Sequence, residues 1–328
     1  MGQSKPKPFA RGLSEVQMAG LARAMESRHH WWKDLLSLWR PSGHETGDDG
    51  LRLAIRDGYL NFYRRGQSVA RVAFAKGGEP HLSVHAKYVV SDAERKLPNL
   101  RYARLKTTEI SHDDLTRNYK GIDSLKSWIK VVDAHFTKKG DEKSLVDQLL
   151  DVYENGGVID LEMALPAWER NQAAPRMDLV TIEEVSNRLT VVFGEVKRVR
   201  DSRIRSSVAA EPKVRPEVLK QLWDYEDFLS EAAHRDAISK AYQLTAKGLV
   251  QLNEMAKSLR GELKLGDTII AAAGDGDLRV AKRATLVVMC TGKFSQDHWS
   301  EHRKVLNQQG AKVVELSRPM PMNLGADL

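Results

Sequence analysis

Apolar and polar positions alternate with a period of two over much of the first third of the chain. Residues 51–56 and 59–64 both show this alternation, and Asp57 and Gly58 between them form a dipeptide typical of a hairpin turn. Two further strands are predicted over 68–74 and 81–90. The pattern therefore predicts an antiparallel meander.

A longer period, close to that of an α-helix, precedes the meander. Ser14 is a residue typical of an N-cap, and residues 15–39 follow it with apolar positions on one helical face. Residues 1–12 are rich in Lys, Pro and Gly, and we expect them to form a loose tail. The segment 97–139 has a mixed pattern of helix and loop. The first 139 residues thus predict an α+β unit.

The second half of the chain has a different order of elements. A helical pattern over 142–154 is followed by three strand patterns, a helical pattern after Pro216, a strand, a helix and a last strand. The predicted strands are 158–165, 176–185, 189–199, 284–291 and 311–316, and the later helices are 217–259 and 295–309. Strands interleaved with helices predict an α/β fold with a mixed sheet flanked by helices. We expect two domains, an N-terminal α+β accessory domain of residues 1–139 and an α/β domain of residues 140–328.

Composition narrows the class of protein. The chain of 328 residues is 41% hydrophobic and 29% charged, as soluble globular proteins are. No run approaches the roughly 20 apolar residues of a membrane span, so we expect no membrane contact and no secretory signal. The single cysteine, Cys290, fits a cytoplasmic location. The net charge of +7 favours an anionic partner such as nucleic acid.

Two acidic residues and a lysine are expected to meet at one end of the central hairpin of the second half. If Ser186 and Asn187 form a two-residue turn, Asp178 lies directly opposite Glu195, with Cβ atoms about 4.5–5.5 Å apart. Lys197 lies two residues further on, on the same face as Glu195. Adjacent carboxylates repel each other unless a cation lies between them, and hard oxygen ligands suit Mg²⁺. The pattern therefore indicates a metal site.

The same three residues could instead form an ion-pair ladder on a sheet surface, because Glu and Lys two apart on a strand are common. The flanking residues favour a functional site. Residues 179–182 and 189–194 are mostly apolar or β-branched, which is typical of interior strands. Charges at the ends of buried strands are costly unless they serve a purpose.

At these residues the chain resembles the PD-(D/E)XK nuclease superfamily. The match consists of Pro175 with Asp178, of Glu195 and Lys197 with one residue between them, and of the order helix, three strands, helix, strand over roughly 142–316. One departure is that two residues separate the proline from the aspartate, which are adjacent in the motif that names the family. The resemblance implies a restriction-endonuclease-like core in the nuclease domain of residues 140–328.

A second match lies on the following helix. Gln221 and Tyr225 give the QxxxY pattern of the exonuclease-like branch, and residues four apart project from one helical face. The resemblance implies that Asp178, Glu195 and the carbonyl of Val196 hold Mg²⁺ or Mn²⁺. It also implies that Gln221 and Tyr225 steady the phosphate or the catalytic lysine, although residues on an ordinary amphipathic helix have the same spacing.

The resemblance also assigns the remaining catalytic roles. Lys197 would orient the attacking water or stabilise charge on the phosphate. An additional acid from the preceding strand would ligate through water or assist a second metal ion. Glu162 is the favoured residue for this role, with Asp160 and Glu154 as rivals, because the facing of the strand decides between them.

A run of basic residues follows the predicted lysine. Arg200, Arg203 and Arg205 lie directly after the strand that ends near 199, beside the expected path of a phosphate backbone. We expect them to contact DNA, because phosphate contacts position nucleic acid without reading its sequence. Charge runs of this kind also occur as solvated faces.

The N-terminal meander mixes basic and aromatic side chains, a combination that suits nucleic acid. These residues are Arg52, Arg56, Arg64, Arg65, Arg71 and Lys87 with Tyr59 and Tyr63. Solvated outer faces of strands have the same composition. The role of this domain therefore stays open between target recognition, a partner protein and contact with a second copy of the chain.

The sequence as a whole predicts a metal-dependent nuclease that hydrolyses phosphodiester bonds, most often those of DNA in the family that it resembles. Restriction, repair and defence against foreign DNA are the settings in which such enzymes act. Two alternatives stay open, namely a non-catalytic nucleic-acid-binding or scaffold subunit with a nuclease-like fold, and an RNA-cutting effector. A binding module needs neither the two acids nor the lysine, so their joint presence favours the enzyme.

Overall fold

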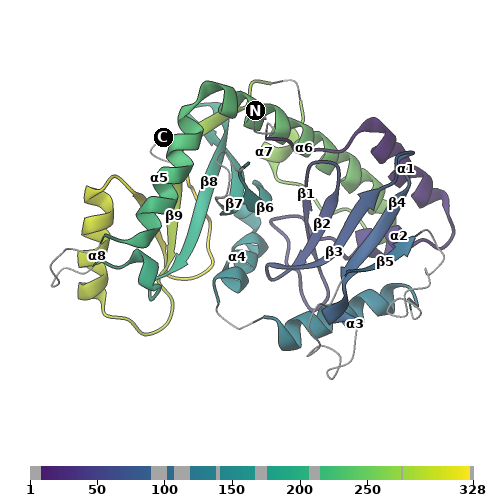
Figure 1. Cartoon of the computed structure of the whole chain (residues 1–328), viewed down its shortest axis with the longest axis horizontal. Helices are drawn as coiled ribbons and strands as arrows, with labels where there is room; N and C mark the ends of the chain where they lie inside the picture. Colours follow the sequence, from purple (N-terminus) through teal and green to yellow (C-terminus); the bar gives the residue numbers. More distant parts are fainter. Residues whose placement is uncertain are drawn as a thin grey trace, which may run out of the picture.

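The strands of the described part of the chain form two five-stranded sheets, with helices packed around them (Figure 1). The computed structural model describes residues 9–89, 102–106, 119–137, 141–166, 176–206, 215–274 and 276–325. The fold is of the α/β class, with one antiparallel and one mixed sheet flanked by helices.

The first sheet is antiparallel, and its strands lie side by side in the order in which they occur in the chain. Its strands are β1 (Arg52–Ile55), β2 (Leu60–Arg64), β3 (Gln67–Phe74), β4 (Pro80–His85) and β5 (Tyr102–Lys106). The predicted meander is confirmed for the first four strands. The prediction that the fourth strand continues to residue 90 is wrong, because the His85 side chain accepts a hydrogen bond from the Lys87 amide and a short 3-10 helix begins there. The sequence did not predict β5.

The helices of the N-terminal half pack around this sheet. They are α1 (Glu15–Glu26), α2 (Trp31–Leu38) and α3 (Ile122–His135). Ser14 caps α1 as predicted, with its side chain accepting from the Gln17 amide. The single helix expected over 15–39 is wrong, because the chain leaves the helical conformation at Ser27 and His30 caps a new helix by accepting from the Trp32 amide.

The second sheet has the strand order β10-β9-β8-β7-β6. The strands β6 (Val158–Ala164), β7 (Arg176–Val185) and β8 (Arg188–Arg198) are antiparallel, and β9 (Arg279–Met289) and β10 (Lys312–Leu316) add in parallel to β8. The helices are α4 (Glu142–Asp151), α5 (Glu217–Ser230), α6 (Ala232–Arg260), α7 (Asp267–Ala272) and α8 (Gln296–Gln308). The mixed sheet and the order helix, three strands, helices, strand, helix, strand are therefore confirmed. The prediction of one helix over 217–259 is wrong, since Glu231 is extended and separates α5 from α6.

The tight turn between β7 and β8 positions the centre of the second sheet. Ser186 and Asn187 both have positive φ, at 50° and 58°, which is the conformation of the type I′ turn of two-residue hairpins. From Val185 paired with Arg188, the register continues without a bulge along the hairpin. The inner part of β8 is buried, with Lys197 among its buried residues, as expected for a central strand.

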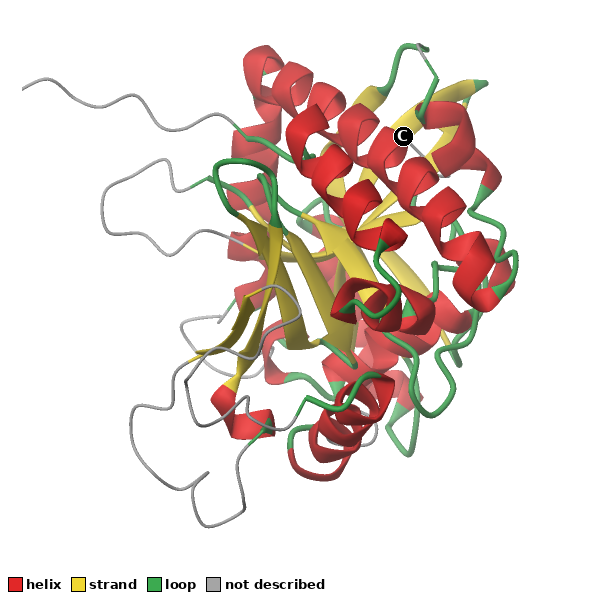
Figure 2. Ribbon diagram, turned by 90° about the vertical axis from the view of Figure 1, so that its right-hand side faces the viewer, coloured by secondary structure: helices red, strands yellow, loops and turns green. Residues whose placement is uncertain are grey.

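Helix α6 connects the two halves of the molecule. It packs against α2 and β1 on one side and against α5, β6 and β9 on the other, and it runs across the top of Figure 1. Figure 2 shows the long helices against one side of the strands. One hydrophobic core contains residues of both halves, among them Trp32, Phe62, Phe193 and Tyr242. The domain boundary near residue 139 stays a prediction.

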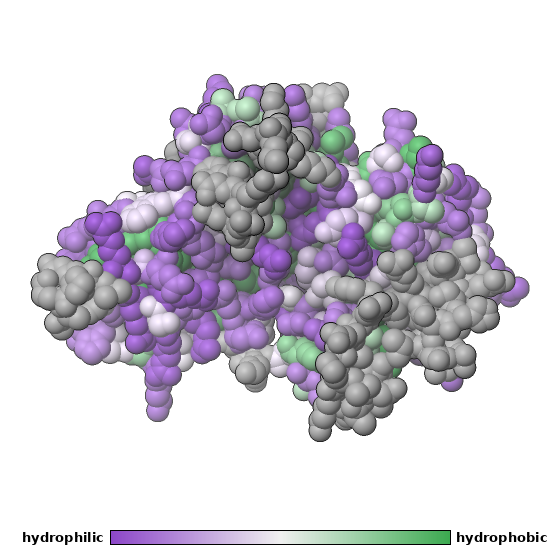
Figure 3. Space-filling model, viewed as in Figure 1, coloured by the Kyte–Doolittle hydropathy of each residue, from purple (hydrophilic) through white to green (hydrophobic). Residues whose placement is uncertain are grey.

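Hydrophilic residues cover most of the face seen in Figure 3. The hydrophobic areas on this face are small and separate from one another. Within the parts of the chain that the structure describes, no helix is long and apolar enough to cross a membrane.

Candidate active site

The β7–β8 hairpin brings Asp178 beside the strand that carries Glu195. The ladder runs from Val185 paired with Arg188 to Leu179 paired with Gly194. Asp178 and Glu195 come next on the two strands, at the same level, as the sequence predicts. The Asp178 Oδ2 atom accepts a hydrogen bond of 2.7 Å from the amide of Val196. This bond fixes the carboxylate at the end of the hairpin.

The ammonium group of Lys197 lies among oxygen atoms from four residues. Its Nζ contacts the Glu195 carboxylate and lies 2.9 Å from the carbonyl oxygen of Val196. It lies 3.3 Å from Glu142 Oε1 and 3.6 Å from Asp178 Oδ2. We call Lys197 and these four oxygen-bearing groups the Lys197 cluster. They are the carboxylates of Glu195, Glu142 and Asp178 and the carbonyl of Val196. The three predicted residues Asp178, Glu195 and Lys197 therefore converge on one point.

Glu142, the third acid of the cluster, was not predicted as a site residue. It is the first residue of α4, whose N-cap is Asp141, and its carboxylate contacts both Lys197 and Arg203. Acids in the first turn of a helix are common because their negative charge interacts favourably with the positive end of the helix dipole. An acid in the first turn of a predicted helix therefore did not distinguish Glu142 as a site residue.

The cluster is closed on one side and open on the other. The side chains of Lys197 and Glu195 are 1% and 2% exposed, whereas those of Asp178 and Glu142 are 19% and 25% exposed. Solvent therefore reaches the site along the Asp178 and Glu142 edge, and a phosphate could approach from the same side.

Helix α5 places Tyr225 and Gln221 against the buried end of the cluster. The Tyr225 hydroxyl lies 3.2 Å from Glu195 Oε2 and contacts the carbonyl oxygen of Arg176. Gln221 Nε2 donates to the same carbonyl at 3.1 Å and contacts the tyrosine hydroxyl. The hydroxyl has one proton, so it can donate to Glu195 or to the carbonyl but not to both at once. Both residues thus act on the position of Glu195 and of the first residue of β7.

The carboxylates of Asp178 and Glu195 are difficult to ionise. Burial raises the pKa of Asp178 well above its ordinary value, and the negative charge of Glu195 raises it further. Burial also raises the pKa of Glu195, although Lys197 opposes this shift. A divalent cation between them would offset the cost of their ionisation.

Lys197 remains charged despite its burial. Burial lowers its pKa, but the carboxylates of Asp178, Glu195 and Glu142 together raise the pKa above the ordinary value. The lysine therefore acts as a cation and as a hydrogen-bond donor, and it is not a proton acceptor at neutral pH.

The three predicted DNA-contacting arginines differ in their surroundings. Arg203 pairs with Glu142 at 2.9 Å and with Asp201 at 2.6 Å, so its charge is shared with the acids of the site. Arg200 and Arg205 are exposed. The basic run thus lies next to the cluster. Arg203 pairs with Glu142 of the cluster, and Arg200 and Arg205 face solvent.

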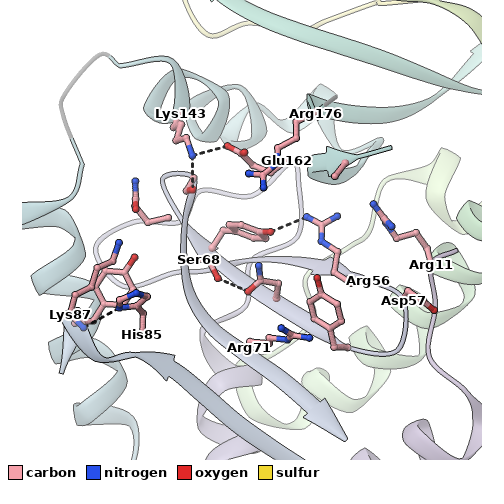
Figure 4. Close-up of a pocket in the computed structure, with 17 residues that line it drawn as sticks. Arg11, Arg56, Asp57, Ser68, Arg71, His85, Lys87, Lys143, Glu162 and Arg176 are labelled. Atoms are coloured by element: carbon pink, nitrogen blue, oxygen red, sulfur yellow. Dashed lines mark hydrogen bonds and ion pairs between the residues drawn. The ribbon is translucent and has the colours of Figure 1, made fainter. Parts of the chain in front are cut away.

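The predicted additional acid, Glu162, is not part of the cluster. It has a positive φ of 49°, and its carboxylate pairs with Lys143 at 3.1 Å and lines a separate cavity (Figure 4). Of its two rivals, Asp160 is buried and paired with arginines, and Glu154 lies on the edge of another pocket. The positive φ of Glu162 is a conformation that residues other than glycine rarely adopt, and the alternation of the sequence could not show it.

The donor set of the cluster fits a divalent cation in its chemistry. It consists of carboxylate and carbonyl oxygens, which are the ligands that Mg²⁺ and Mn²⁺ prefer. Asp178, Glu195 and the Val196 carbonyl are the residues that would hold such an ion. Among the described residues, no three acidic, histidine or cysteine side chains are arranged around a metal site as they stand. The Lys197 ammonium occupies the point on which the oxygens converge, so a metal ion would compete with it.

The fold and this site define an α/β protein that has a charged cluster at the end of a buried hairpin. A comparison with protein-family models, curated proteins and solved structures finds no match to the chain.

Proposed function

We propose that this protein is a Mg²⁺- or Mn²⁺-dependent nuclease that hydrolyses phosphodiester bonds of DNA, with a PD-(D/E)XK-like centre. The observation that carries the proposal is the convergence of Asp178, Glu195, Glu142 and Lys197 on one point at the partly open end of a buried hairpin. The mixed sheet and its helices are consistent with the restriction-endonuclease-like core that the resemblance implies.

The site contains more acidic than basic side chains, and a bound cation would balance this difference. Four carboxylates meet there, those of Glu142, Asp178, Glu195 and Asp201, and two positive side chains, Lys197 and Arg203, pair with them. A purely structural cluster would be expected to balance its charges, because an uncompensated buried charge is costly. The acidic excess therefore supports a site for a metal ion.

The side chains of the chain have distinct roles in the proposed reaction. A bound divalent cation would neutralise the scissile phosphate and lower the pKa of a coordinated water. Lys197 stays protonated and donates a hydrogen bond, so it can orient the attacking water or stabilise the charge that develops on the phosphate. The Tyr225 hydroxyl lies 3.2 Å from Glu195 Oε2, and when it donates to this oxygen it holds the carboxylate in place.

The surface beside the cluster suits a phosphate backbone. Arg200 and Arg205 are exposed at the end of β8, and the chain as a whole carries a net charge of +7. Such contacts contribute binding that weakens steeply with salt. They support a nucleic-acid substrate and do not distinguish DNA from RNA, because the backbone phosphates are shared.

A cleavage assay tests the proposal. The full chain is incubated with circular DNA, linear DNA and RNA, each with Mg²⁺, with Mn²⁺ or with chelator, beside Glu195→Gln and Lys197→Ala. We expect metal-dependent cleavage of DNA by the native chain and a loss of at least about 100-fold in both variants, as for removal of a transition-state contact. Cleavage that persists in both variants would contradict the assigned centre, and preferential cleavage of RNA would favour the RNA-cutting effector.

One observation favours a second candidate, a non-catalytic nucleic-acid-binding or scaffold subunit. The Lys197 ammonium already bonds the oxygens that a metal would need, and an internal cation of this kind can stabilise the fold without chemistry. In that case Mg²⁺ and Mn²⁺ would leave the melting temperature unchanged, and no substrate would be cleaved under any condition of the assay.

A further inference from the structure

A basic cavity of about 520 Å³ lies between the first sheet and the edge of the second (Figure 4). On the side of the second sheet, the cavity is lined by Arg176, Glu162 and Lys143. The remaining wall consists of residues from the strands of the first sheet and from the segments beside them. Pockets for small ligands have volumes of roughly 300–1,000 Å³. A single nucleotide fits this volume, whereas a double helix does not.

The cavity is strongly positive. Six cationic side chains line it, against the carboxylates of Asp57 and Glu162. The cationic residues are Arg11, Arg56, Arg71, Lys87, Lys143 and Arg176. Burial and the nearby charge of Lys143 lower the pKa of Lys87, which indicates that the positive charges repel one another. An anion in the cavity would relieve this repulsion.

The cations differ in what they already contact. Arg56 pairs with the buried Asp160, and Lys143 pairs with Glu162 at 3.1 Å. Among the residues that the structure describes, Arg71 and Arg176 form no ion pair, and both are exposed. These two arginines can thus contact an external anion without breaking an ion pair of the fold.

Aromatic and amide side chains add a surface for a base. The guanidinium of Arg71 lies over the ring of Tyr59, 3.9 Å from its centroid. The side-chain oxygen of Asn61 accepts a hydrogen bond of 2.7 Å from the Ser68 hydroxyl, and both residues line the cavity. Stacked aromatic and guanidinium groups beside a positive groove are features of single-strand binding sites.

The cavity also borders the proposed catalytic centre. Arg176 is the first residue of β7 and lies two positions before Asp178, on the same face of the strand. Two residues of a strand span about 6.8 Å, and the carbonyl of Arg176 is the one that Tyr225 and Gln221 contact. A strand with one phosphate at Asp178 would therefore have a neighbouring nucleotide at the mouth of the cavity.

We propose that this cavity binds one nucleotide of a single nucleic-acid strand, with Arg71 and Arg176 on its phosphates and its base against Tyr59. The proposal rests on the proposed nuclease function, because it places this strand beside the scissile phosphate. It assigns the N-terminal sheet a part in substrate binding, one of the roles that the sequence left open.

Binding is measured by fluorescence anisotropy of a fluorescein-labelled oligothymidylate with the full chain, in chelator so that metal-dependent cleavage does not interfere. We expect Tyr59→Ala to weaken binding roughly 5- to 100-fold, as loss of one stacked base does. Arg71→Ala and Arg176→Ala should each reduce the slope of log affinity against log salt by about 0.7. The matched controls are Arg188→Ala, at the exposed β7–β8 turn, and Tyr153→Ala, whose residue is 69% exposed; both should bind as the native chain does.

Three outcomes would overturn the proposal. They are native affinity in all three cavity variants, an equal loss in the two control variants, and displacement of the oligothymidylate by thymidine monophosphate at lower concentration than by unlabelled oligothymidylate. The last result would mean that the cavity takes a free nucleotide. If no substrate is cleaved while the cavity variants still weaken binding, the nuclease function fails and the cavity stands. If cleavage occurs and the cavity variants bind normally, the nuclease function stands and the proposed role of the cavity fails.

Discussion

Asp178 shows most directly how burial and chemistry oppose each other at this site. Its carboxylate accepts one amide hydrogen bond and lies 3.6 Å from the Lys197 ammonium, yet burial and Glu195 hold its pKa well above the ordinary value. A group with a raised pKa contributes stability below the pKa of the unfolded chain. That contribution is lost as pH rises through the raised pKa of the folded state.

This sign leads to a prediction for Asp178→Asn. At pH 8 the folded native chain carries the free-energy cost that raises the pKa of Asp178, and the neutral amide does not. The melting temperature of the variant in chelator should therefore exceed that of the native chain by about 2 °C. The difference should disappear near pH 4, where the native carboxyl is protonated. Mg²⁺ should raise the melting temperature of the native chain at pH 8 and leave that of the variant unchanged. A variant that is less stable than the native chain at pH 8 would contradict the assignment.

The additional acid at the site is Glu142 and not the predicted Glu162. A pair of matched variants tests this assignment. Glu142→Gln should lower the rate of cleavage by about 10- to 100-fold, because Glu142 contacts Lys197 and Arg203 at the centre. Glu162→Gln, the same substitution at the predicted residue, should leave the rate within about twofold, because Glu162 pairs with Lys143 outside the cluster. Initial rates on linear DNA measure both. The opposite ranking would restore Glu162 to the centre.

At the scale of elements, the β7–β8 hairpin is the part that the sequence predicted best. The apolar flanks and the short turn required one register, because a shift of one residue would turn the buried face outward. The breaks at Ser27 and Glu231 were not predicted, since the apolar period continues across both. His30 caps the helix that follows the first break, whereas at the second break the side chains of His234 and Arg235 contact the last carbonyl groups of α5. The additional strand β5 also lies in a segment without a clear alternation.

The turn of this hairpin can be tested by stability. Ser186 has a φ of 50°, a conformation that side chains branched at Cβ avoid. Ser186→Val should lower the free energy of unfolding by about 1–2 kcal/mol, and Ser186→Gly should raise it by about 0.5 kcal/mol. Urea denaturation followed by circular dichroism measures both values. Equal stability of the two variants would mean that this residue does not hold a positive φ.

At the scale of the whole molecule, a buried polar network joins the two sheets. Asp160 of β6 pairs with Arg11 at 3.2 Å and with Arg56, which lies directly after β1. The Tyr242 hydroxyl of α6 donates to the same carboxylate at 3.1 Å. Four segments that lie far apart in the sequence thus meet at one aspartate, whose side chain is 1% exposed.

Removal of this aspartate should destabilise the whole chain. Asp160→Ala leaves two arginines without their buried partner, so the free energy of unfolding should fall by about 3–5 kcal/mol. Asp224→Ala, which breaks the exposed pair with Lys220, is the matched control and should leave stability nearly unchanged. Urea denaturation measures both, and we expect one transition for the native chain, because one core contains residues of both halves. Similar stability of the two variants would exclude the network as a link between the sheets.

The sequence by itself determined the features that depend on neighbouring residues in the chain. These are the meander of the first four strands, the α/β order of the second half, and the meeting of Asp178, Glu195 and Lys197 on one hairpin. A strand pair joined by a short turn has few possible registers, so its pattern is sufficient to place these residues.

Only the tertiary structure decided which distant groups complete the site. Glu142 reaches the cluster from the start of another helix, Glu162 turns away at an irregular point of β6, and Arg176 and Arg71 meet at one cavity from different sheets. Such contacts depend on how helices and sheets pack, and this packing is set by side chains throughout the core. Local periodicity does not contain that information.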